Sequence, residues 1–400
     1  MKRERRVVLI AVLSLLAVTS GSSARADGGF FPPENGTANS ADQRAVIVDQ
    51  GDTQTIILET AYEGDRSDFA WVIPLPELIS GQECITTAAP DIFDKLRERS
   101  EPRWWSQGSA ALCGCGGSAT IQEPPVTVWE RLRVDDYDVA ILSAQQSSDL
   151  ATWLNDNGYS FPEAQEPTLE YYVNRGWYFV AFKMAPTDED GQAGAPNDGG
   201  FGGGLGGEEL KPIQMTFPTD QLIFPLRISQ ISSLGRTEIL LYVIAPHRMH
   251  SENYATAQVD VPDSYNGGDF QADYAGWFED AIADAGGTAF VVEYAGEVSS
   301  NFADFVGIGD LVDGSQDYFV TRLRTYLTPA QMTEDVKLVA APSDDPFEVN
   351  LTSSQFTQAR IGLAGGMLLI AGVQAFAVRS SRRRGYVLAA AVAGAMMLIL

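Results

Sequence analysis

Two histidines are the first residues whose type and spacing could support chemistry. His247 and His250 stand three residues apart, directly after an apolar, strand-like segment. Histidine is the usual catalytic base near neutral pH and a common metal ligand. However, no acidic residue completes a zinc-protease pattern such as H-E-x-x-H, and no G-x-S-x-G nucleophile motif occurs. We therefore predict surface positions for both histidines and assign no catalytic residue, although a triad assembled in space around either one stays open.

The three cysteines, Cys84, Cys113 and Cys115, are the second set of candidates. The C-x-C spacing differs from the C-x-x-C of thioredoxin-like sites, and no fourth ligand stands at a zinc-finger spacing. An odd number of cysteines allows one internal bridge, and C-x-C is too short for an unstrained one. We expect a disulfide from Cys84 to either Cys113 or Cys115, which requires an oxidising compartment.

Two acidic runs, Asp135 to Asp138 and Asp188 to Asp190, could offer oxygen ligands to a hard cation. Neither follows the EF-hand register, since Ala193 stands where the second run would need its turn glycine. The second run opens a segment rich in Gly, Asp and Glu, residues 188–209, which lacks the Lys-Ser/Thr of a phosphate-binding loop. We predict solvated acidic loops, a flexible segment at 188–209, no metal site and no cofactor.

The strands that must position these groups are visible as short runs of β-branched and aromatic residues. Residues 43–48 and 53–61 are typical of a hairpin, and residues 69–73 form a third strand that ends at prolines. The segment at 211–217 could pair with 177–184 across the glycine-rich segment. Further strands are predicted at 126–134, 137–142, 238–245, 288–294 and 318–326.

Helices are predicted where apolar residues recur at helical spacing between start and stop signals. One begins near Pro90, two follow Ser147 and Pro167, and the strongest pattern covers residues 270–284 before a Gly-Gly stop. A helical turn is expected at 327–332. This mixture predicts an α+β fold, mostly antiparallel sheet with several packing helices.

The N-terminus has the pattern of a secretory signal peptide. Residues 1–26 combine a basic start, an apolar core and an A-x-A ending, which predicts cleavage before Asp27. The apolar core is too short to span a bilayer. The Arg5-Arg6 pair leaves the twin-arginine export route open.

The C-terminal part predicts a membrane anchor. Residues 361–378 carry no charge and have the length of a short transmembrane helix. Residues 379–384 include four arginines, which marks the cytoplasmic side, and the apolar residues 385–400 either return across the membrane or lie against the first helix. An exported domain at 27–340 and a polar stalk at 341–360 would then lie on the extracytoplasmic side of the cell membrane.

The overall charge excludes one class of partner. The chain carries a net charge of −26, so it repels nucleic acid. Because the two predicted targeting segments are basic, the part between them is more acidic still. The hydrophobic fraction of 45% is typical of a folded globular protein. We therefore expect one large domain or two intimate ones.

Six motifs together resemble a bacterial family known as domain of unknown function 2330. They stand at Gly28–Phe31, Asp68–Pro76, Tyr137–Leu142, Leu154–Tyr159, Tyr172–Phe182 and Leu327–Met332. The resemblance implies a signal peptide and often a C-terminal anchor. Cysteines often flank the Gly-Gly-Phe-Phe element in the family, whereas Asp27 and Pro32 stand there in this chain. The resemblance implies no activity and no catalytic residues.

Two kinds of function fit these patterns. The first is a membrane-tethered binding or structural module of the cell envelope, whose partner, a protein or an envelope polymer, is not identified. The alternative is an envelope enzyme, hydrolase-like, with an unrecognised active site. The lack of a catalytic motif favours the first. The observation that separates them is whether His247 or His250 meets a serine, cysteine or carboxylate in space.

Overall fold

The computed structural model describes much of the domain at 27–340 that the sequence analysis predicts to be exported. The residues described are 29–31, 42–60, 70–79, 81–104, 127–135, 137–184, 210–233, 235–262 and 269–351. The predicted signal peptide, Cys113, Cys115, the 188–209 segment and the predicted anchor at 361–400 lie outside them. The chain divides into two compact units. The larger comprises residues 1–101, 112–260 and 277–348, and the smaller comprises 102–111, 261–276 and 349–400.

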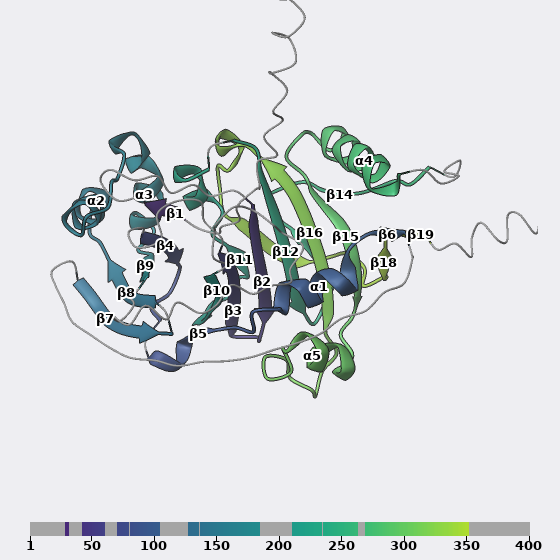
Figure 1. Cartoon of the computed structure of the whole chain (residues 1–400), viewed down its shortest axis with the longest axis horizontal. Helices are drawn as coiled ribbons and strands as arrows, with labels where there is room; N and C mark the ends of the chain where they lie inside the picture. Colours follow the sequence, from purple (N-terminus) through teal and green to yellow (C-terminus); the bar gives the residue numbers. More distant parts are fainter. Residues whose placement is uncertain are drawn as a thin grey trace, which may run out of the picture. The chain divides into compact units, whose positions relative to one another are not determined.

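The larger unit contains a five-stranded sheet in which all neighbours are antiparallel (Figure 1). In spatial order its strands are β1 (Gly29–Phe31), β4 (Ala70–Leu75), β9 (Tyr178–Met184), β8 (Tyr137–Ser143) and β7 (Thr127–Val134). Alternate residues of β4 enter two different cores, with Trp71 and Ile73 on one side and Val72 on the other. Because both faces of the sheet are covered at this strand, its sequence is a continuous apolar run.

A second sheet of nine strands lies in the same unit. In spatial order its main path is β14 (Thr256–Gln258), β15 (Phe290–Glu297), β16 (Phe319–Leu327), β12 (Thr237–Ala245), β2 (Gln43–Asp49), β3 (Thr53–Thr60), β10 (Leu210–Pro218) and β5 (Ile85–Thr87), and β18 (Phe347–Glu348) pairs with β15. The pairs β2–β12 and β14–β15 are parallel. The hairpin considered between 177–184 and 211–217 does not form, because β10 pairs with β3 and β5.

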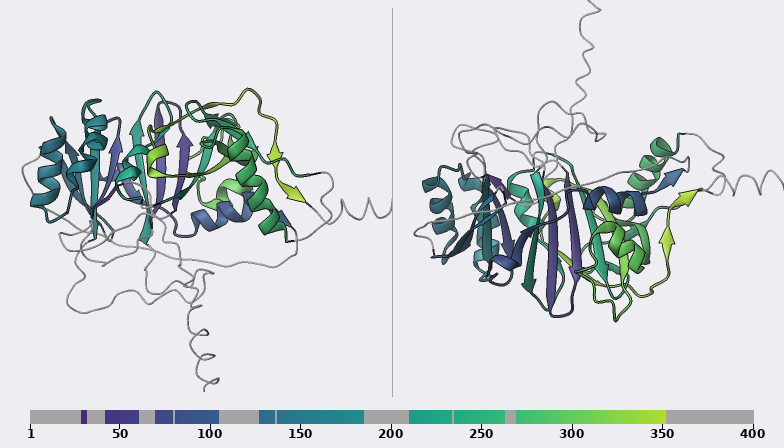
Figure 2. Two further views of the ribbon diagram at one scale, coloured as in Figure 1. Left: turned by 90° about the horizontal axis from the view of Figure 1, so that it is seen from above. Right: turned by 60° about the horizontal axis from the view of Figure 1, so that its bottom comes forward.

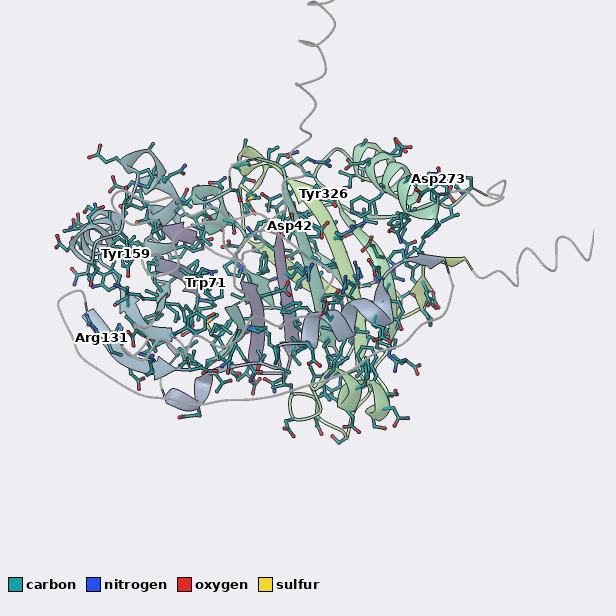
Figure 3. All side chains as sticks on the ribbon, in the orientation of Figure 1. Asp42, Trp71, Arg131, Tyr159, Asp273 and Tyr326 are labelled. Carbon is teal, nitrogen blue, oxygen red and sulfur yellow. The ribbon has the colours of Figure 1, made fainter. Side chains whose placement is uncertain are left out.

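Helices complete four layers around three apolar cores. The two sheets share one core, which contains Trp71 (labelled in Figure 3). Its ring packs against that of Phe182, with 5.2 Å between the ring centroids. Helices α2 (Ser147–Asp156) and α3 (Glu166–Val173) cover the outer face of the five-stranded sheet. Helices α1 (Ile92–Ser100) and α5 (Ser300–Val306) cover the outer face of the nine-stranded sheet. Figure 2 shows the same order of layers from above.

Local sequence signals explain where these helices begin and end. Pro167 occupies the first turn of α3, where a missing backbone N–H costs nothing. The hydroxyl of Ser299 caps α5 by accepting a hydrogen bond from the Phe302 N–H. Gly307 then ends α5 with a φ of 87°, a left-handed conformation that favours glycine.

Shorter elements connect the layers. Strands β11 (Ile223–Phe224), β17 (Val336–Ala340) and β13 (Met249–Ser251) form a small sheet. The 3-10 helices are η1 (Gln82–Cys84), η2 (Glu163–Gln165), η3 (Arg227–Ile231) and η4 (Pro329–Gln331). Helix α4 covers Phe270–Asp284, and in the smaller unit β6 (Arg103–Trp104) pairs in parallel with β19 (Asn350–Leu351).

The predicted α+β class is confirmed, with most strand pairs antiparallel among the described residues. Residues 347–348, which the sequence analysis assigns to the polar stalk, form β18 and pair with β15. No helix in the described part of the chain is both long and apolar enough to cross a membrane.

Candidate functional site

The two histidines predicted to lie at the surface occupy different settings. His247 is 61% exposed, and its Nδ1 lies 2.9 Å from Asp344 Oδ2. This hydrogen bond lowers the pKa of the Asp344 carboxyl. The hydroxyl of Ser343 donates to Asp345 and not to His247. His250 is partly buried in β13. Within the described residues His247 therefore has an orienting carboxylate, as in a triad, but contacts no nucleophile.

The first acidic run is held by basic side chains. Asp135 Oδ2 lies 2.6 Å from Lys211 Nζ, and Asp138 Oδ1 lies 3.0 Å from Arg133 Nη1. Asp135 has a φ of 52°, which suits the tight turn between β7 and β8. These ion pairs give both carboxylates a structural role. No group of three or more His, Cys, Asp or Glu side chains within the described ranges could hold a metal ion.

Cys84 ends η1 and packs partly buried against the core between the sheets. Burial, followed by the negative charges of Glu83 and Glu130, raises the pKa of its thiol. A raised pKa is the opposite of the low pKa that makes a catalytic thiolate reactive. Its expected partners, Cys113 and Cys115, lie outside the described residues, so the disulfide stays a prediction.

A charged network crosses the outer face of the nine-stranded sheet. Glu293 Oε2 accepts a hydrogen bond of 2.6 Å from Arg322 Nε, and Glu293 Oε1 lies 2.8 Å from Arg324 Nη2. Arg322 also donates to the hydroxyl of Tyr242, whose pKa burial raises to about 12. At the end of the same face, Tyr326 donates to Glu238 at 2.5 Å. Because its charges are mutually compensated, this network is structural.

The candidate site is a cluster of five residues that we call the Asp335 cluster: Tyr171, Tyr172, Arg175, Arg227 and Asp335. Three separate segments position it. Tyr171 and Tyr172 lie on the last turn of α3, and Arg175 follows just before the chain turns at Gly176 into β9. Arg227 opens η3, and Asp335 directly precedes β17.

The buried half of the cluster is organised around one carboxylate oxygen. The hydroxyl of Tyr172 donates to Asp335 Oδ1 at 2.6 Å, and the backbone N–H of Arg227 donates to the same atom at 3.0 Å. The Tyr172 hydroxyl in turn accepts from the N–H of Ile228 at 2.9 Å. Asp335 Oδ2 is buried without a hydrogen-bond partner among the described residues.

The charge of Asp335 is costly in this position. Burial raises the pKa of the Asp335 carboxyl to about 6, although the hydrogen bonds from Tyr172 and Arg227 and the charges of Arg227 and Arg175 oppose the shift. A buried carboxyl with a perturbed pKa and specific charged partners is a functional-site candidate. Burial and the nearby Asp335 charge also raise the pKa of Tyr171.

The outer half of the cluster consists of two guanidinium groups on one phenol ring. The guanidinium carbon of Arg175 lies 3.5 Å from the Tyr171 ring centroid, and that of Arg227 lies 4.3 Å from it. Arg175 Nη1 donates to the backbone oxygen of Tyr171, and Arg227 Nη1 donates to that of Thr333. Neither arginine forms an ion pair within the described residues. The cluster therefore presents positive charge on an acidic protein.

The sequence analysis did not single out Asp335, Arg227 or Arg175. The sequence gives one hint of the cluster, which is its closeness to two of the family motifs. Asp335 follows the Leu327–Met332 motif, and Tyr172, its hydrogen-bond partner, opens the Tyr172–Phe182 motif. No spacing rule links residues that come from three separate segments.

Comparison with known proteins identifies a family. A family model described as "uncharacterized protein conserved in bacteria (DUF2330)" matches residues 22–339, which include the whole Asp335 cluster. No curated protein and no solved structure matches the chain.

Proposed function

The chain belongs to the DUF2330 family of uncharacterized bacterial proteins, and from this premise we propose that it is a membrane-tethered binding module of the cell envelope. The observation that carries the proposal is the sequence pattern on both sides of the described domain. A signal-like segment at 1–26 precedes it, and the uncharged segment 361–378 follows it, ending at four arginines in 379–384. Positive charge of this kind is retained in the cytoplasm, which puts the domain on the other side.

The arrangement of charged groups supports binding over catalysis. The network around Glu293 and the ion pairs of Asp135 and Asp138 stabilise the fold and offer no reacting group. The Asp335 cluster, in contrast, presents two arginines that form no ion pair among the described residues. It supplies charge for recognition.

Reporter fusions test the location. Alkaline phosphatase, which is active outside the cytoplasm, is fused after Gln358, after Arg384 and after Leu400. We expect activity at Gln358 and none at Arg384. Inactivity at Gln358 would overturn the orientation, and the fusion at Leu400 reports whether residues 385–400 return across the membrane.

A second candidate function, an envelope hydrolase, is favoured by one contact, the 2.9 Å hydrogen bond between His247 and Asp344. A carboxylate that orients a histidine is one element of a catalytic triad. The test compares His247→Ala with the matched variant His250→Ala in ester hydrolysis, with p-nitrophenyl acetate as the probe. Turnover that is lost in the first variant alone, without unfolding, would favour the hydrolase over the binding module.

A further inference from the structure

We propose that Arg175 and Arg227 form a binding site for one small oxyanion, a carboxylate or phosphate group carried by the ligand of this module. The inference rests on the proposed binding function and names the chemistry that the ligand must present. The site is built on the phenol ring of Tyr171, which brings the two guanidinium groups together from different segments.

Stacking on the ring leaves most of the hydrogen-bond donors of both arginines available. A guanidinium has five N–H donors in its plane. Each side chain uses one of them on a backbone oxygen, that of Tyr171 for Arg175 and that of Thr333 for Arg227. The Nε of Arg227 is buried without a hydrogen-bond partner among the described residues. The other terminal N–H groups of the two guanidiniums are the donors that a planar carboxylate or a phosphate would use, accepting two at once.

Arg175 and Arg227 form no ion pair among the described residues, unlike several arginines elsewhere in the described part of the chain. Arg44, Arg133, Arg236 and Arg322 each form an ion pair with an acidic residue. With a net charge of −26, the chain has acidic residues in excess, so the lack of an ion pair at both arginines is not explained by a shortage of acidic partners. An external anion completes the site.

The nearest compensating charge is buried. Asp335 Oδ1 accepts hydrogen bonds from Tyr172 and from the Arg227 backbone, the residue is 2% exposed, and its carboxyl forms no ion pair with either guanidinium group. The charged groups that face this carboxyl are Arg227 from η3 and Arg175 beyond α3, and Glu334 precedes it in the chain. It offsets the positive charge through space without occupying the site.

The ligand class follows from the charge around the site. A polyanion would be repelled by the acidic protein as a whole, whereas a single oxyanion on a small or otherwise neutral ligand experiences mainly the two nearby arginines. Protonation of Asp335 at lower pH removes its compensating charge. Affinity for an anion of constant charge should therefore increase as the pH falls from 7 to 5.

The test is calorimetric titration of the purified full-length protein with three probes. Sulfate keeps its charge over this pH range and therefore tests the pH dependence. Phosphate and acetate test whether the site takes a phosphate or a carboxylate group. We expect saturable binding. Its affinity should fall about tenfold or more in Arg175→Gln and in Arg227→Gln, because each variant loses one charge-assisted bidentate contact. Arg175 is exposed, so its variant keeps the fold even if Arg227→Gln does not.

The matched control is Arg99→Gln. Arg99 is an exposed arginine that also stacks on an aromatic ring, 4.6 Å from the centroid of Phe305, but without a second arginine. Its variant should bind as the unmodified protein does. Equal binding by all variants, or no saturable binding by any probe, would overturn the inference. Because these titrations do not depend on membrane orientation, they fail or succeed separately from the fusion experiment.

Discussion

At the scale of single residues, the carboxyl of Asp335 combines full burial with hydrogen bonds to one oxygen only. Burial disfavours the charged form, while the two donors to Oδ1 favour it. The balance leaves the pKa of Asp335 at about 6, so its charge changes in a range where histidine normally titrates. Neither histidine shares this setting, since His247 is exposed and His250 is only partly buried.

This pKa predicts how stability depends on pH. The folded-state pKa of Asp335 lies above its ordinary value of 3.8, so the folded protein binds this proton more tightly than the unfolded chain. The contribution is fully present below pH 3.8 and is lost as the pH rises through about 6. A shift of about two units corresponds to about 3 kcal/mol.

The variant Asp335→Asn isolates this contribution. Its amide oxygen can still accept from Tyr172 and Arg227, but it carries no titrating proton. Urea unfolding followed by tryptophan fluorescence at pH 4 and pH 7 should show that the variant lacks the decrease assigned to Asp335. Parallel pH dependence in the two proteins would contradict the assignment.

At the scale of elements, an irregularity in β15 explains how a charged side chain enters the interior. The register with β16 shifts between Val292 and Tyr294, so Glu293 is the extra residue of a β-bulge. Glu293 lies on the outer face of the sheet, where its carboxylate contacts both Arg322 and Arg324. Its neighbour Val292 faces the core between the two sheets.

Loss of the Glu293 charge should therefore be costly. In Glu293→Gln the nearly buried Arg322 loses its compensating charge, and we expect the free energy of unfolding to fall by about 3 kcal/mol or more. Glu279→Gln is the matched control, because Glu279 pairs with Arg236 at 2.7 Å with both side chains near half exposed. That variant should cost about 1 kcal/mol or less. Equal losses in urea unfolding would argue against a structural role for the bulge.

Individual elements were predicted from sequence more readily than their pairing. The expected helix at 270–284 is observed as α4, and the helices after Ser147 and Pro167 as α2 and α3. These patterns are local, because apolar spacing and stop signals lie within one element. Strand order, the β15 bulge and the Asp335 cluster depend on contacts between distant segments. Strand β17 was missed because its five residues are too few for a clear alternation of apolar and polar residues.

At the scale of the whole molecule, the position of Cys84 bears on the expected disulfide. Cys84 is partly buried against the core shared by the two sheets. A bridge to Cys113 or Cys115 would close a loop of roughly thirty residues and stabilise the protein by roughly 3 kcal/mol. Peptide mapping of the native protein without reduction should find one such bridge and one remaining thiol. Three alkylatable thiols in freshly isolated protein would count against it.

The parallel contact between β2 and β12 has a consequence for how the molecule is made. Strand β2 lies near the start of the domain, yet it pairs in the centre of the nine-stranded sheet with β12, which itself pairs with β16. Contacts between sequence-distant strands form slowly, because the intervening chain must first be brought together. The hairpin of β2 and β3 can therefore gain its second neighbour in the sheet only once the chain has been synthesised as far as β12, which ends at Ala245. We expect this sheet to form late in folding, and the apolar strands to be prone to aggregation until it does.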